Sequence, residues 1–130
     1  MARDNGATPL FVAAQNGHET MVRALIEMGA DVKKAMDDGV PPLLIAAYNG
    51  HEAVVRALID LGANINKAKN NDATPLFVAA QFGYETVVRA LIEMGADVNK
   101  AMNVGATPLY SAAQEGHAAI VQILRDAGAA

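Results

Sequence analysis

Apolar residues recur along this chain in short blocks with helical spacing, separated by glycine and polar residues. The segment from His18 to Met28 places Met21, Val22, Leu25 and Ile26 three or four positions apart. This spacing predicts an α-helix with one apolar face. A helix of this length is shorter than the ~12 to 15 residues that independent stability in water requires.

A second, shorter helix is predicted directly before it. Thr8 is placed as a helix N-cap and Pro9 as the first helical residue, which is the arrangement that favours a helix start. Gly17 ends this helix, and Gly29 is positioned as a left-handed cap after the longer one. Because neither helix is stable alone, the pairs must pack against further copies.

The same pattern recurs with a period of 33 residues. All eleven glycines fall into three recurring positions, and four of the five prolines share one position. Glycine and proline mark backbone conformation, so one conformation is used four times. We therefore expect a single domain, 1–130, built of four units. These are unit one, 4–36, unit two, 37–69, unit three, 70–102, and unit four, 103–130.

The pattern resembles the ankyrin repeat family over essentially the whole chain. The matching residues in unit one are Thr8-Pro9-Leu10, Ala13-Ala14, Gly17-His18, Val22, Leu25-Ile26 and Gly29-Ala30-Asp31-Val32. The resemblance implies an all-α repeat solenoid of helix-turn-helix units with β-hairpin-like fingers. One departure is that the family usually has His after the Thr-Pro-Leu motif, where this chain has Phe11, Leu44, Phe77 and Tyr110.

The last unit replaces apolar residues that the other units keep. Arg125 stands where the other units have isoleucine, Ser111 where they have valine or isoleucine, and Ala127 where they have methionine or leucine. Because the end of a solenoid needs a polar outer face, we expect all three to mark a C-terminal edge. Unit one shows no such change, so we expect that a preceding repeat is missing or that this end meets another molecule, and we favour the first.

Composition narrows the classes of partner. The chain has 10 basic and 14 acidic residues, a net charge of -4, and no cluster of basic residues, which argues against a general nucleic-acid binder. It has no cysteine and no apolar run near the ~18 residues of a membrane span. The first residues lack the pattern of a signal or transit peptide. We therefore expect a soluble, cytoplasmic protein with no membrane partner.

The residues that could carry chemistry have structural explanations. His18, His51 and His117 share one position in units that stack ~10 Å apart, too far apart to share a metal ion. The only serine, Ser111, lies in an otherwise apolar position without a His and Asp set. Glutamate precedes arginine by four residues in three units, which favours helix-stabilising ion pairs, namely Glu19–Arg23, Glu52–Arg56 and Glu85–Arg89. We predict a non-enzyme with no metal and no cofactor.

The resemblance implies a binding surface instead, because ankyrin proteins commonly bind partners in a concave groove formed by finger tips and first helices. Carried over position by position, the candidate tip residues are Asp4, Asn5, Asp37, Asp38, Val40, Asn70, Asn71, Asn103 and Val104. The candidate positions at the ends of first helices are Gln15, Asn16, Tyr48, Asn49, Gln81, Phe82, Gln114 and Glu115.

Two aromatic residues distinguish the central units, since Tyr48 and Phe82 stand where unit one has Gln15 and Asn16. We expect them to anchor a partner protein, so that alanine at both positions abolishes binding with little change in stability. The alternative is that they serve as ordinary packing between repeats. Acidic residues nearby favour a basic or mixed-charge partner.

A rival interpretation is a structural or engineered, consensus-like scaffold without a partner. Its support is that units one and three agree at 27 of 33 positions. We expect a monomer, with the apolar N-terminal face as the candidate surface for self-association.

Overall fold

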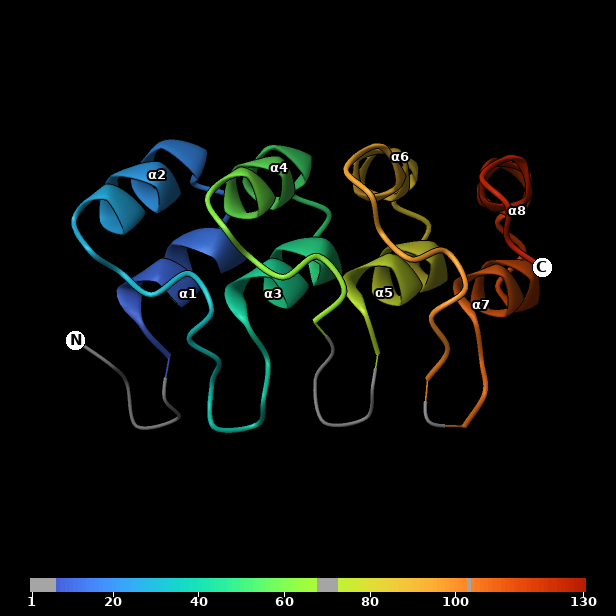
Figure 1. Ribbon diagram of the computed structural model, residues 1–130, viewed down its shortest axis with the longest axis horizontal. Helices are drawn as coiled ribbons and strands as arrows, with labels where there is room; N and C mark the ends of the chain where they lie inside the picture. Colours follow the sequence, from blue (N-terminus) through green and yellow to red (C-terminus); the bar gives the residue numbers. More distant parts are fainter. Residues whose placement is uncertain (1–6, 68–72, 103) are drawn as a thin grey trace.

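The computed structural model describes residues 7–67, 73–102 and 104–130 and shows a stack of paired helices. The helices lie in two rows, with α1, α3, α5 and α7 in one and α2, α4, α6 and α8 in the other (Figure 1). Within the described ranges there are eight helices and no strand, which confirms the all-α repeat solenoid. They are α1 Pro9–Gln15, α2 Glu19–Glu27, α3 Pro42–Tyr48, α4 Glu52–Asp60, α5 Pro75–Phe82, α6 Glu85–Glu93, α7 Pro108–Gln114 and α8 Ala118–Asp126.

The first helix of each unit starts as the sequence predicts. The Oγ1 atoms of Thr8, Thr74 and Thr107 each accept a hydrogen bond of 3.1 Å from the backbone N–H three residues on. Unit two has Pro41 at this position and no side-chain cap. Each of these helices has proline as its first residue, where a missing N–H costs nothing.

Two apolar clusters hold the stack together. The larger lies between the two rows of helices and contains, among others, Leu43, Val55, Leu58 and Leu76, all at most 1% exposed. The smaller, which we call the finger-base cluster, lies where the loops meet the first helices. Its buried members are Ala7, Phe11, Val40, Leu44, Ala73, Phe77 and Val78. The family's usual histidine position is thus occupied by core residues in the first three units.

The described parts of the loops between units lie along one edge of the stack, beyond the row of α1, α3, α5 and α7 (Figure 1). The Met36 N–H donates to the Val40 carbonyl at 2.9 Å, and the Met102 N–H donates to the Ala106 carbonyl at 2.8 Å. Each pair closes a tight, hairpin-like turn. Backbone hydrogen bonds therefore hold the two arms of these fingers together without an assigned strand among the described residues.

The outer row of helices carries the expected ion pairs. The Glu19–Arg23, Glu52–Arg56 and Glu85–Arg89 pairs lie at 2.9, 2.9 and 3.2 Å. Arg56 also reaches Glu93 of the next unit at 3.0 Å. The pKa of Arg56 is raised because its guanidinium donates hydrogen bonds to Glu52 and then to Glu93. Arginine thus links neighbouring units as well as successive turns of one helix.

The prediction that three residues of unit four mark the outer edge is wrong for Ser111. Ser111 is 4% exposed although no unit follows unit four within the described residues, so its burial does not require a following unit. Ile26 of unit one, which is equivalent to Arg125, is half-buried although no described unit precedes it. The following unit therefore covers this position, and in unit four it faces the outer edge. Arg125 is exposed. Ala127 is exposed too, at a position where Met28 of unit one is 82% exposed but Leu61 and Met94 are half-buried. The preceding unit therefore covers this position, so Ala127 does not mark the C-terminal edge and the prediction is wrong there as well.

Candidate binding surface

The candidate positions at the ends of the first helices differ in how much they offer to a partner. Tyr48 and Gln81 are half-buried, whereas Phe82 is 46% exposed. The others are exposed, namely Gln15, Asn16, Asn49, Gln114 and Glu115. The amide of Asn49 donates to the carbonyl of Ile45 in its own helix at 3.0 Å. Among these candidate positions, Phe82 is therefore the most accessible large apolar group.

Phe82 lies between two tyrosines at the joint of units two and three. Its ring centroid is 5.4 Å from that of Tyr48, at an interplanar angle of 49°. On its other side the ring of Tyr84 lies 6.1 Å away, nearly edge-on at 71°. Both are favourable geometries for aromatic rings. Tyr48 also packs against the finger-base cluster, so the exposed ring of Phe82 rests on an anchored neighbour.

Tyr84 is a residue that the sequence analysis did not assign to this surface. At the first joint the His51 Nε2–H donates to the Gln15 carbonyl at 2.9 Å, and at the third the His117 Nε2–H donates to the Gln81 carbonyl at 3.1 Å. Tyr84 stands at the equivalent position of the second joint and packs over Gly50. The sequence did carry a signal for it, because Tyr84 stands at the repeat position where the other three units have histidine.

Two of the three histidines have the structural role that the sequence predicted for them. His51 and His117 each reach the last residue of a first helix in the preceding unit. Among the residues that the structure describes, no group of three or more His, Asp or Glu side chains could hold a metal ion. Ser111 is buried, at 4% exposure.

The finger tips contribute acidic and apolar groups. Asp37 and Asp38 are exposed, and the Asp38 carboxylate accepts a hydrogen bond from the Val40 N–H at 3.2 Å. Val104 is 80% exposed. The inclusion of Val40 among the contact residues is wrong, because its side chain is 8% exposed within the finger-base cluster. The remaining tip candidates, Asp4, Asn5, Asn70, Asn71 and Asn103, lie outside the described residues.

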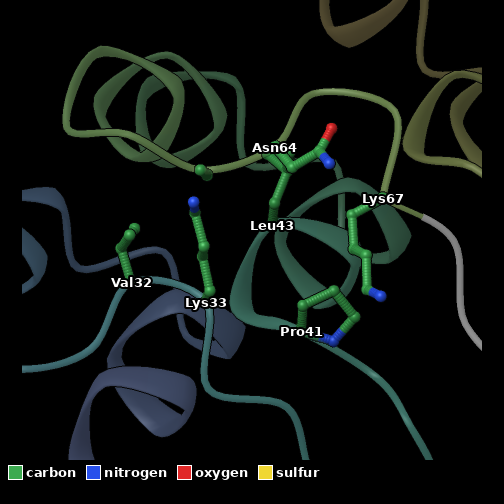
Figure 2. A pocket seen from close by; sticks show the side chains of 7 residues that line it. Val32, Lys33, Pro41, Leu43, Asn64 and Lys67 are labelled. Carbon is green, nitrogen blue, oxygen red and sulfur yellow. The ribbon is translucent and has the colours of Figure 1, made fainter.

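A separate pocket of about 260 Å³ lies between the loops of units one and two. Figure 2 shows its lining, with Val32, Pro41 and Leu43 as apolar contributors and the ammonium groups of Lys33 and Lys67 pointing in different directions. At the later joints Asn66 and Asn99 accept hydrogen bonds of 3.0 Å from the backbone N–H of Asp97 and Ala130. Lysine has no acceptor atom, so Lys33 cannot form the equivalent bond at the first joint.

No helix in the described ranges has both the length and the apolar character needed to cross a bilayer. The eight short helices instead form four stacked pairs (Figure 1).

Comparison with known proteins agrees with this architecture. A family model described as "Ankyrin repeats (3 copies)" matches residues 1–69 and again residues 61–130. No curated protein matched the sequence. Ankyrin repeats are generally protein-interaction modules and are typically non-catalytic. Because the two matches together cover the chain from end to end, this protein belongs to the ankyrin-repeat family.

Proposed function

We propose that this protein binds another protein, without catalysis, through the concave groove of finger tips and first helices. The observation that carries the proposal is the exposed ring of Phe82, 46% accessible and seated against Tyr48 at 5.4 Å in the middle of the stack. Large aromatic side chains near the centre of an interface commonly supply most of its binding energy. A solitary exposed apolar residue is ordinary, but this one rests on a fixed aromatic base.

The two central aromatics have different roles in this proposal. Phe82 is the anchor, because nearly half of its surface remains for a partner to cover. Tyr48 is half-buried and packs against the finger-base cluster, so it holds Phe82 in place and offers one side of its own ring. The polar positions on either side, Gln15, Asn16, Asn49, Gln81, Gln114 and Glu115, form a rim that can hydrogen-bond.

The charge of the groove favours a basic or mixed-charge segment. Asp37 and Asp38 stand exposed on the finger between units one and two, and Glu115 stands exposed at the end of α7. Cationic side chains are also attracted to the faces of aromatic rings, by ~0.5 to 1 kcal/mol at exposed sites. A partner with lysine or arginine beside an apolar residue fits both features.

Selection from a random-peptide display library on the immobilised protein tests the proposal. We expect the selected peptides to be enriched in lysine, arginine and apolar residues. Their affinity should fall about thirtyfold or more with Phe82→Ala, which is ~2 kcal/mol for a hot spot. Met28→Ala is the matched control, since Met28 is 82% exposed but belongs to the second helix row. Its variant should bind like the parent protein.

The scaffold interpretation predicts the opposite result, with no binding in the groove. If no peptide is enriched, or if the selected peptides bind the Phe82→Ala variant undiminished, the groove is not a binding site in this chain. The close agreement of units one and three, at 27 of 33 positions, would then reflect a consensus-like array.

A further inference from the structure

The two ends of the stack carry the two halves of the joint that recurs inside it. At the N-terminal end, Met21 is 52% exposed, whereas the equivalent Val54 and Val87 are fully buried by the preceding unit. Leu25 is half-buried, whereas Leu58 and Leu91 are fully buried. We call this surface the N-face, and it comprises Pro9, Val12, Met21, Leu25 and Met28. It is the side of a unit that a preceding unit covers.

The C-terminal end shows the complementary half. Tyr110 is 57% exposed, whereas the equivalent Phe11, Leu44 and Phe77 are at most 7% exposed. Ala113 is exposed where the other units have a fully buried alanine. This surface, the C-face, comprises Leu109, Tyr110, Ala113 and Val121, and it keeps the apolar character of the internal joints.

The two partners of a further contact, a histidine ring and the glycine on which it packs, also lie at opposite ends of the stack. Inside the stack, a Cβ atom placed on Gly17 or Gly83 would lie 2.7 Å from the ring of His51 or His117, so each ring lies directly on a glycine. At the C-face, no atom of the residues that the structure describes lies within 4 Å of the corresponding point at Gly116, although its φ of +77° matches the others. Gly116 therefore has the conformation of the other glycines but no histidine ring packed on it.

The N-terminal end has a histidine ring that packs on no glycine in the described ranges. His18 is exposed on the N-face, at the position that His51 and His117 occupy in later units. Within the described residues, no hydrogen bond of its ring to a carbonyl corresponds to the 2.9 Å bond of His51 to Gln15. An open depression of about 460 Å³ lies beside it, lined among others by Val12, His18 and Met21.

We propose that this chain associates head-to-tail with a second copy of itself, the N-face of one copy covering the C-face of the other. The His18 ring then lies over Gly116 of the second copy, with Nε2–H donating to the Gln114 carbonyl, as at the internal joints. The interface is heterologous, so each added copy leaves one N-face and one C-face free and the assembly does not close. This inference does not depend on the proposed function, because the aromatic cluster lies two joints from either end.

The charge of Arg125 affects how tightly the two copies would associate. Inside the stack, Arg56 pairs with Glu93 of the following unit at 3.0 Å. Unit four has Gln122 at this arginine position, and Arg125 follows one helical turn later on the same side of α8. Arg125 can therefore face Glu27 of the second copy, but it also interrupts the apolar C-face. We expect association to be weaker than an internal joint and to become tighter in an Arg125→Ile variant.

Two blocking variants test the proposal by complementation. Met21→Glu places a charge on the N-face, and Ala113→Glu places one on the C-face. Both residues are exposed in the single chain, so neither change disturbs its own core, which circular dichroism would confirm. Ala53→Glu adds the same charge on exposed α4 in the middle of the stack and serves as the matched control.

Sedimentation velocity over a wide range of protein concentration gives the readout. The parent chain and Ala53→Glu should rise in average mass with concentration and pass beyond a dimer, while each blocking variant alone stays at 13.5 kDa. An equimolar mixture of Met21→Glu and Ala113→Glu should form dimers, since one retains a C-face and the other an N-face. The proposal is overturned if the parent chain stays monomeric, if Ala113→Glu dimerises alone through paired N-faces, or if the mixture stays monomeric while the parent associates.

Discussion

The Nε2 atom of His51 lies 2.9 Å from the carbonyl oxygen of Gln15, the last residue of α1. The bond joins residues 36 positions apart and places the imidazole directly over Gly17. One side chain thus satisfies a carbonyl at the helix end, where intrahelical donors are missing, and fixes the spacing between two units.

Removal of this ring should weaken the stack. We expect His51→Ala to lower the free energy of unfolding by ~1 to 2 kcal/mol, because the Gln15 carbonyl loses its partner and the ring its packing. Urea unfolding followed by circular dichroism measures the change. His18→Ala is the control, since His18 is exposed at the end of the stack, and it should shift stability by less than ~0.5 kcal/mol at concentrations where the chain is monomeric. Equal effects at the two positions would contradict the assigned role.

The glycine beneath the ring offers an independent test. Gly17 and Gly116 have φ of +75° and +77°, so alanine at either position should cost about 1 kcal/mol in backbone strain. Only at Gly17 would the added methyl meet a ring, at 2.7 Å from His51. We expect Gly17→Ala to destabilise the protein by a further ~1 kcal/mol or more. Thermal unfolding of the two variants measures this difference, and identical losses would argue against a seated ring.

Pro41 is the weak helix start of the four. The other first helices have a threonine cap with a bond of 3.1 Å, and α3 has none. We expect Pro41→Thr to stabilise the protein by about 0.5 kcal/mol, since a cap contributes ~1 kcal/mol and the lost proline rigidity offsets part of it. The reciprocal control is Thr74→Val, which removes a buried cap and should cost ~1 kcal/mol. Chemical denaturation would show a shift of the opposite sign if Pro41 served α3 better than a cap.

The central aromatics should separate binding from stability. We expect Phe82→Ala to cost about 1 kcal/mol or less, because the ring is 46% exposed. Tyr48→Ala should cost ~2 kcal/mol, because its half-buried ring packs on the finger-base cluster. The initial expectation of little stability loss is thus kept for Phe82 and revised for Tyr48. Unfolding of both single variants and the double variant would give their coupling, expected at ~0.5 to 1.5 kcal/mol for a contacting aromatic pair.

Much of the fold follows from local chemistry in the sequence. Thr8-Pro9 starts a helix wherever it occurs because a hydroxyl cap and a fixed φ act on the adjacent backbone. The Glu52–Arg56 pair forms because residues four apart meet on any helix. Such interactions depend on neighbours along the chain, so reading the sequence could predict them.

The candidate site could be predicted only in part from the sequence, because the exposure of its side chains depends on which unit covers each of them. Val40 lies beside exposed Asp38 in sequence but is buried, since its side chain turns into the finger-base cluster. Ser111 looked like an outer-face residue because polar residues favour solvent, yet it is only 4% exposed. Tyr84 joined the site through contact with Phe82 and Gly50, the second of which lies in another unit.

The sequence by itself therefore determined the repeat, its period and the start of each helix, because these rest on backbone preference and on contacts within one turn. Only the tertiary structure decided which side of each unit is covered, which histidine is hydrogen-bonded across a joint, and which aromatic ring stays exposed. Those properties arise between residues more than 30 positions apart, as with His51 and Gln15. Burial there is set by the neighbouring unit, and the same residue type at the same position is buried inside the stack and exposed at its ends.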